Sequence, residues 1–266
     1  MAGVSDATAR FSDRVDAYVA ARPGYPDGVV EALVERGLGA GSVVADLGAG
    51  TGIFTAMLLD AGATVHAVEP NGPMREALAA RFGEHPRLHV HDTPAEATRL
   101  AAGSVDLVTA AQAFHWFDVP AVRTECARIL RPSGLVALVW NTRIDDATPF
   151  LRGYEDLLRR RGTDYAAVDH RRNQDERLAA FFGPETSLER HPFANHQVLD
   201  APGLRARLLS SSYSPMPGHP DHEPMLTELD ALVAEHGTDG RVVLEYRTEL
   251  VIGRVGAPGG AGGAGR

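Results

Sequence analysis

The sequence has little of what several classes of protein require. It contains one cysteine, Cys126, so no disulfide forms within the chain. This is consistent with a protein of the reducing cytoplasm. No apolar run approaches the length of a membrane span. The first residues carry Asp6, Arg10, Asp13 and Arg14 and lack the apolar core of a secretory signal. We therefore expect a cytoplasmic protein without a membrane anchor.

Positive charge is also scarce. Lysine and arginine total 26 against 35 aspartates and glutamates, a formal net charge of -9 at pH 7. Phosphate backbones and anionic membranes repel such a chain, so we expect neither nucleic acid nor membrane as a partner. Hydrophobic residues make up 44% of the 266, enough for a substantial core in one large domain or one and a half.

Strands and helices are predicted to alternate in the first half of the chain, after helices at residues 6–21 and 29–36. Apolar runs predict strands at residues 43–47, 64–69, 87–91, 105–110 and 135–140. Helical patterns lie between them at residues 53–61, 73–82 and 119–130, and a turn is predicted at residues 131–134. This alternation predicts a doubly wound α/β sheet.

The second half differs in pattern. Helices are predicted at residues 148–161, 171–182, 202–209 and 222–236, and a late antiparallel pair of strands at residues 187–199 and 241–252. We expect a nucleotide-binding core with cap helices at residues 1–145. An insert and strands that complete a seven-stranded sheet would follow at residues 146–252, then a disordered Gly/Ala tail at residues 253–266.

The most informative segment is the run from Asp46 to Gly52, between a predicted strand and a predicted helix. Glycines favour a sharp turn there and let a ligand approach the backbone, while the helix start offers free N–H groups. Glu69 ends the second strand, where a carboxylate accepts both hydroxyls of a ribose. A dinucleotide fingerprint would have its third glycine at position 53, but this residue is Ile53, so the sequence disfavours NAD as the ligand.

This Asp-x-Gly-x-Gly-x-Gly pattern resembles motif I of the class I S-adenosylmethionine (SAM) methyltransferases, which have a Rossmann-like fold. Further segments resemble a small-molecule group similar to the trans-aconitate methyltransferases. They are residues 11–14, Tyr18, residues 22–26, 93–96, 111–117, 131–134 and 140–141. The resemblance implies a SAM-dependent enzyme that releases S-adenosylhomocysteine.

The resemblance also implies a set of cofactor contacts. Asp46 would help to hold the ammonium group through water, Glu69 the ribose, and Arg22 the carboxylate. The full set of expected cofactor-binding residues is Phe11, Tyr18, Arg22, Asp46, Gly48, Ala49, Gly50, Thr51, Gly52, Glu69, Pro70, Met74, Ala95, Glu96, Ala111, Gln112, Ala113 and Phe114. Each has a plainer interpretation: Arg22 as a surface charge, and Phe11 and Tyr18 as core-facing helix residues.

The acceptor side is less specific. Candidate catalytic residues are His115, Trp116, Asn141, Ser211 and Tyr213. The serine run at residues 210–212 is equally well explained by local backbone bonds at a helix end. His89 and His91 lie two apart on one strand, but no third ligand is evident and no metal is expected.

Three functions remain open from the sequence. The first is methyl transfer to a small-molecule acceptor. The second is cyclisation of SAM itself to azetidine-2-carboxylate, with methylthioadenosine leaving, because residues 140–141, 163–165, 170–171 and 211–213 resemble segments of the azetidine-2-carboxylate synthases. The third is SAM binding without chemistry. Neither the acceptor nor the oligomeric state follows from the sequence.

Overall fold

A computed structural model describes residues 22–163, 165, 174–183 and 186–256. The helix predicted at residues 6–21 and nearly all of the tail lie outside these residues. The elements in chain order are α3 (Asp27–Val34), β1 (Val43–Leu47), α4 (Ile53–Asp60), β2 (Thr64–Val68), α5 (Gly72–Phe82), β3 (Leu88–His91), β4 (Val105–Ala111), the 3-10 helix η1 (Phe114–Trp116), α6 (Val119–Ile129), β5 (Leu130–Arg143), α7 (Pro149–Arg161), α8 (Gln174–Phe182), β6 (Glu189–Asp200), α9 (Ala201–Leu209), α10 (His222–His236) and β7 (Arg241–Gly253).

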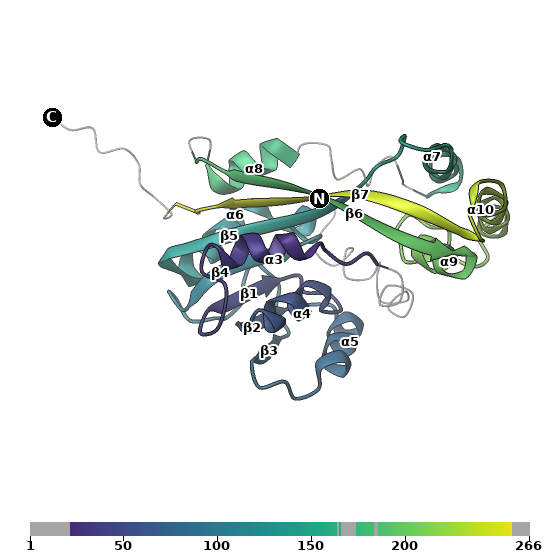
Figure 1. The fold of residues 1–266 in the computed structure, drawn as a ribbon. Helices are drawn as coiled ribbons and strands as arrows, with labels where there is room; N and C mark the ends of the chain where they lie inside the picture. The colour runs from purple at the N-terminus through teal and green to yellow at the C-terminus, as the bar shows by residue number, and fades with distance from the viewer. Residues whose placement is uncertain (1–21, 164, 166–173, 184–185, 257–266) are drawn as a thin grey trace. The chain divides into compact units, whose positions relative to one another are not determined.

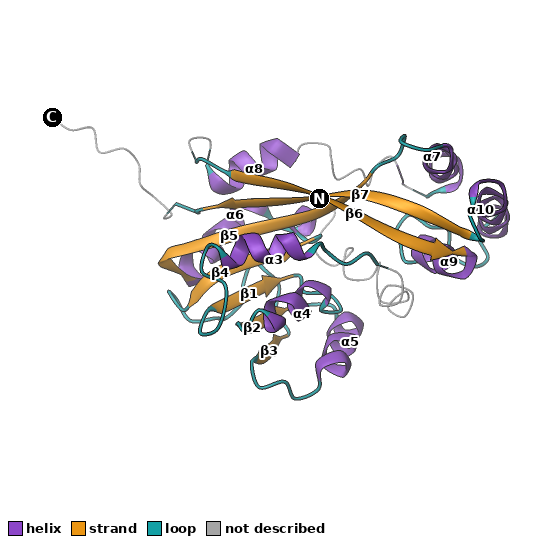
Figure 2. Cartoon of the chain, viewed as in Figure 1, coloured by secondary structure: helices purple, strands orange, loops and turns teal. Residues whose placement is uncertain are grey.

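The described residues form a seven-stranded sheet in the order β3-β2-β1-β4-β5-β7-β6 (Figures 1 and 2). The predicted α/β class and sheet are confirmed. β1 pairs in parallel with β2 and with β4, so the chain order reverses at β1, and this switch point is where open α/β sheets bind ligands. β1 is buried along nearly its whole length, whereas the edge strand β6 alternates between exposed and half-buried residues.

The chain divides into two compact units, each made of several segments. Among the described residues, unit 1 comprises 22–26, 140–163, 165 and 192–249, and unit 2 comprises 27–139, 174–183, 186–191 and 250–256. β5 and β6 run from unit 2 into unit 1, and β7 runs from unit 1 into unit 2. β7 is therefore antiparallel to both of its neighbours.

The turn predicted at residues 131–134 is wrong, because those residues belong to β5. Val105 pairs with Leu130 and Leu107 pairs with Leu135, so two steps along β4 oppose five along β5 and a bulge takes up the difference. A Cβ at Gly134 would lie 2.7 Å from Leu130 Cδ2, which shows how tightly this bulge is folded. Proline and glycine mark an irregular strand here rather than a chain reversal.

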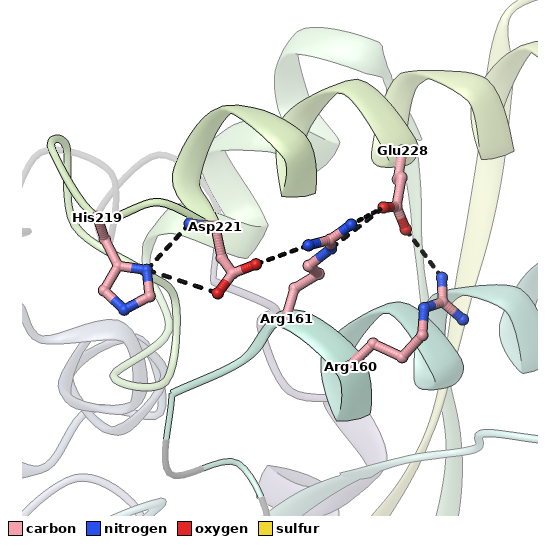
Figure 3. Close-up of polar contacts among 5 residues, drawn as sticks. All are labelled: Arg160, Arg161, His219, Asp221 and Glu228. Atoms are coloured by element: carbon pink, nitrogen blue, oxygen red, sulfur yellow. Dashed lines mark hydrogen bonds and ion pairs between the residues drawn. The ribbon is translucent and has the colours of Figure 1, made fainter.

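Unit 1 has its own apolar core, in which α7, α9, α10 and the start of β7 pack together. The largest buried members include Phe150, Leu158, Leu208, Met225 and Tyr246. The basic end of α7 is paired with acids at the start of α10, as Figure 3 shows: Arg160 and Arg161 both bind Glu228, and Arg161 also binds Asp221. None of the described helices is both long and apolar enough to span a membrane.

Three histidines meet near the β3 edge of the sheet. His66 Nδ1 lies 2.9 Å from His91 Nε2, and the His66 ring stacks on His89 at 5.0 Å between centroids. Burial, with smaller contributions from the charges of His91 and His89, lowers the pKa of His66 to about 4. Within the described ranges, no group of three His, Cys, Asp or Glu residues is arranged to hold a metal.

This cluster predicts a loss of stability in acid. Between the ordinary pKa of 6.5 and the folded value of about 4, the unfolded chain binds more protons than the folded one at His66. We expect the free energy of unfolding to fall by about 1 kcal/mol between about pH 7 and pH 5, since the ring is half exposed and solvent screens part of the effect. Urea denaturation of His66→Gln should show a smaller pH slope, and His196→Gln, at an exposed site, the wild-type slope. An unchanged slope in His66→Gln would contradict this assignment.

Candidate functional site

The loop from Gly48 to Gly52, between β1 and α4, is built around three glycines with positive φ. A Cβ at Gly48 would lie 2.6 Å from Ala113 Cβ, and one at Gly52 would lie 2.6 Å from Phe82 Cε2, so packing within the protein requires both glycines. A Cβ at Gly50 would meet no atom of the described residues within 4 Å. Gly50 therefore presents its backbone to open space, as close approach of a ligand requires.

Glu69 directly follows β2 and is tied to this loop. It is 7% exposed, and its two carboxylate oxygens accept hydrogen bonds from Gly50 N and Asn71 N, both at 2.8 Å. Burial raises the pKa of Glu69, and the two backbone donors and Arg75 oppose that rise. A carboxylate oxygen can accept two hydrogen bonds and each oxygen here accepts one from the backbone, so the carboxylate holds the loop and retains acceptor capacity for a ligand's hydroxyls.

Asn71 begins the helix beside this loop and was missed in the sequence analysis. Its Oδ1 accepts a hydrogen bond from Met74 N at 2.9 Å, which caps α5. Pro70 and Met74 both follow β2 closely in the chain, near its carboxyl end. Met74 is 4% exposed and Pro70 is half-buried. The signal for this cap was in the sequence, since an asparagine precedes a proline at the start of a helical pattern.

Asp46, which we expect to help to hold an ammonium group through water, is bonded to two threonines of the protein. Its two oxygens accept hydrogen bonds from Thr55 Oγ1 at 2.7 Å and Thr109 Oγ1 at 2.8 Å, and it is 1% exposed. Burial raises the pKa of Asp46 to about 6, although both threonines act to lower it. The side chain thus fastens β1 to α4 and β4, beneath the glycine loop.

Asp46→Asn is expected to raise stability at neutral pH. Between pH 3.8 and about pH 6, Asp46 keeps a proton in the folded state that it has lost in the unfolded state. Above this range the charged carboxylate therefore lowers the free energy of unfolding. The isosteric amide keeps partners for both threonines, and we expect a gain of about 1–2 kcal/mol near pH 8 that vanishes near pH 4. Chemical denaturation at both pH values measures it, with Asp60→Asn at an exposed site as control. A loss of stability near pH 8 would contradict this account.

β3 and β4 are parallel to β1 and β2, so their carboxyl ends lie at the same edge of the sheet as the glycine loop. Gln112 follows β4 with φ +54°, a conformation that non-glycine residues rarely adopt and that concentrates at functional sites. After β3, Ala95 is buried, and Glu96 Oε1 accepts a hydrogen bond from Asp118 N at 2.9 Å. The predicted residues Asp46 to Gly52, Glu69, Ala95, Glu96 and Ala111 to Phe114 thus all lie in unit 2, at the carboxyl ends of four neighbouring strands.

The turn after β4 is held by a residue that sequence reasoning did not find. Arg177 of α8 donates from Nη2 to Phe114 O at 3.1 Å and to Phe117 O at 2.9 Å, and its guanidinium lies over the Phe114 ring. Phe114 is 2% exposed and packs on Phe181, so its side chain belongs to the core. His115 and Trp116, by contrast, are half-exposed, with ring centroids 4.9 Å apart.

The other candidates lie elsewhere. Asn141, Ser211, Tyr213 and Arg22 belong to unit 1, and Phe11 and Tyr18 lie outside the described residues. Asn141 Nδ2 donates to Gly24 O at 3.0 Å, and its Oδ1 accepts from Thr248 Oγ1 at 2.5 Å. The serine run makes local bonds of the expected kind, with Ser210 Oγ donating to Arg207 O at 2.7 Å.

The chain is similar to proteins assigned as methyltransferases. A family model described as a methyltransferase domain matches residues 45–138, which contain the glycine loop and Glu69. An uncharacterised methyltransferase of Mycobacterium tuberculosis is 38% identical over 208 residues, or 78% of this chain and 79% of that protein. A methyltransferase-like protein of Schizosaccharomyces pombe is 37% identical over 152 residues, or 56% of this chain and 58% of that protein.

Solved structures share the fold. A protein of Anabaena variabilis, assigned as a methyltransferase of an antibiotic biosynthesis pathway, has a TM-score of 0.61 at 23% identity, covering 88% of this chain and 98% of that one. Phosphoethanolamine N-methyltransferase 2 of Haemonchus contortus, solved with SAM, has a TM-score of 0.51 at 14% identity, covering 91% of this chain and 56% of that one.

Proposed function

Because the chain belongs to the class I SAM-dependent methyltransferases, we propose that it transfers the methyl group of SAM to a small-molecule acceptor. The observation that carries this proposal is the pairing of Glu69 with Gly50: a buried carboxylate holds a loop whose middle glycine faces open space. A nucleoside bound at a strand end needs both features, an acceptor for its ribose hydroxyls and a backbone it can approach.

The residues of unit 2 suit the parts of SAM in turn. Glu69 would accept hydrogen bonds from the ribose hydroxyls, and Gly50 would leave room for the methionine portion. Met74 and Pro70 would pack on the adenine, whose edge would meet Ala95 and Glu96. The turn from Gln112 to His115 would run beside the sulfonium, held in place by Arg177.

Bound SAM supplies a methyl group on a positively charged sulfur. The acceptor's lone pair forms a bond to the methyl carbon as the carbon–sulfur bond breaks, and the electron pair of that bond goes to sulfur. The protein's part is to orient the two reactants in line and to exclude water. His115 is the titratable side chain of the turn after β4, so it is our candidate to take a proton from an acceptor that arrives protonated.

Methyl transfer is preferred over the two alternatives. The proteins that resemble this chain are assigned as methyltransferases, which favours transfer over cyclisation of SAM. Binding without chemistry would need no strained residue such as Gln112 beside the cofactor loop.

The test is mass spectrometry of the purified protein with SAM, alone and with a panel of small nucleophiles. S-adenosylhomocysteine formed only with an acceptor, and not by Glu69→Ala, would support methyl transfer. Methylthioadenosine formed from SAM alone would establish the cyclase instead. SAM bound but left intact with every acceptor of the panel would leave a binding protein and overturn the proposal.

A further inference from the structure

Unit 1 contains a cluster of arginine and tyrosine side chains, none of which is among the unit 2 residues assigned to SAM. Arg143 ends β5, Arg207 lies in the last turn of α9, and Tyr213 follows that helix. Arg207 is 8% exposed, and the Arg143 guanidinium lies 4.8 Å from the centre of the buried Tyr154 ring. These residues meet within one unit, so the cluster does not depend on how the units are placed.

The cluster has more positive than negative charge. Glu155 is its one carboxylate in the described part of the chain, and it already binds Arg143, Arg159 and the Tyr165 hydroxyl. Among the described residues, Arg207 has only neutral hydrogen-bond partners. It donates from Nε to Tyr246 Oη at 3.2 Å and from Nη1 to Ser211 Oγ at 3.0 Å.

Other arginines of the same unit show what is unusual here. Arg160 and Arg161 lie at the surface, and each binds a carboxylate directly (Figure 3). Arg205, two residues before Arg207 on α9, binds Asp230 in the same way. These arginines thus have carboxylate partners although water already solvates their charges. Among the described residues the buried Arg207, which water does not solvate in this way, has no carboxylate partner.

Such an arrangement is costly unless an anion completes it. A guanidinium stays charged in a protein, so Arg207 cannot escape the penalty of burial by losing its proton. Arg143 Nε is also buried, with no hydrogen-bond partner among the described residues. Burial acts to raise the pKa of Tyr213, yet the charges of Arg207 and Arg143 outweigh it and the pKa lies below its ordinary value. The region therefore has a positive potential that attracts an anion.

We propose that Arg207 and Arg143, with the hydroxyl of Tyr213, form a binding site for an oxyanionic group, a carboxylate or a phosphate, of a small molecule. Guanidinium groups pair with both kinds of oxyanion through parallel hydrogen bonds. The site is independent of the proposed function, because every residue that forms it lies in unit 1. Its ligands would be small molecules that carry an acid group.

The test is calorimetric titration of the full-length protein, without SAM, at constant ionic strength. Succinate and inorganic phosphate are the two anionic probes, and the neutral diamide of succinate is the control ligand. We expect at least one anion to bind and the diamide not to bind, and which anion binds more tightly identifies the oxyanion. Equal binding of the diamide, or no binding of either anion, would overturn the proposal.

Variants locate the site. Arg207→Met should weaken anion binding at least about tenfold, and Arg207→Lys, which keeps the charge without the planar fork, should give an intermediate loss. Arg205→Met is the matched control, an exposed arginine of the same helix, and should bind as the wild type does. Wild-type affinity in both Arg207 variants, or an equal loss in Arg205→Met, would contradict the assignment. The lysine variant keeps the test decisive if Arg207→Met does not fold.

Two further readouts separate the possible failures. SAM affinity of the Arg207 variants should stay within about twofold of wild type, because Arg207 belongs to unit 1 and is not among the unit 2 residues assigned to SAM. Anion binding in a protein that never forms S-adenosylhomocysteine would sink the proposed function but leave the oxyanion site. A phenolate absorption band at neutral pH that disappears in Tyr213→Phe would show that the protein supplies its own anion, and would overturn the site.

Discussion

Glu69→Ala is expected to abolish measurable SAM binding while the protein stays folded. The substitution removes the carboxylate that accepts from Gly50 N and Asn71 N, so the glycine loop and the ribose contact are lost together. Loss of charge-assisted hydrogen bonds at a buried site should weaken binding at least about 100-fold, or about 3 kcal/mol. Calorimetric titration with SAM measures the affinity, and circular dichroism checks the fold.

Two companion variants sharpen this prediction. Glu69→Gln keeps one acceptor oxygen, so we expect a loss of about tenfold, between the wild type and the alanine variant. Glu76→Ala removes an exposed carboxylate from α5 close by and should bind SAM as the wild type does. SAM affinity in Glu69→Ala within about threefold of wild type would mean that the nucleoside lies elsewhere.

Gly50→Ala is expected to weaken SAM binding strongly and to lower stability moderately, whereas Gly52→Ala is expected to lower stability the most. At Gly50 a methyl group meets no atom within 4 Å in the part of the chain that the structure describes, so we expect the cost to folding to come from the left-handed backbone, about 1–2 kcal/mol. The same methyl group would enter the space assigned to SAM, and we expect affinity to fall at least about 30-fold. Thermal denaturation and calorimetric titration measure the two effects on one sample.

The controls for Gly50→Ala come from the same chain. Gly103 has φ +61° and equally open surroundings, so Gly103→Ala should lose similar stability and no SAM affinity. Gly52→Ala should be the least stable, by about 2–4 kcal/mol, because the new methyl group overlaps the Phe82 ring and approaches Leu78. If Gly50→Ala binds SAM normally, the open side of the loop does not face the cofactor.

The first half of the fold was predictable because its signals are local. The strands at residues 43–47 and 64–69 and the helix between them follow from apolar runs and glycine turns, and the structure has them within a residue or two. The position of Glu69 directly after a strand is predictable for the same reason, since a carboxylate after an apolar run is visible in the sequence. The helices at residues 148–161 and 222–236 were found from their spacing alone.

What the sequence did not reveal depends on contacts between distant residues. The threonine partners of Asp46 come from α4 and β4, and Arg177 reaches the turn after β4 from more than 60 positions along the chain. Proline and glycine at residues 131–134 are typical of a turn and of a bulge, so the sequence predicts a turn there. Only the pairing with β4 distinguishes the bulge from a turn. The arginine cluster of unit 1 joins β5 to α9, and no spacing in the sequence connects them.

The position of β7 has a consequence for how the chain is made. It is the last strand in sequence, yet it lies between β5 and β6 in the sheet. During synthesis β6 therefore leaves the ribosome without a neighbour to pair with, and β5 keeps an open edge until residues 241–253 arrive. A chain that stopped before Arg241 would expose both edges at once, so completion of the sheet, and protection from aggregation, waits for the final strand.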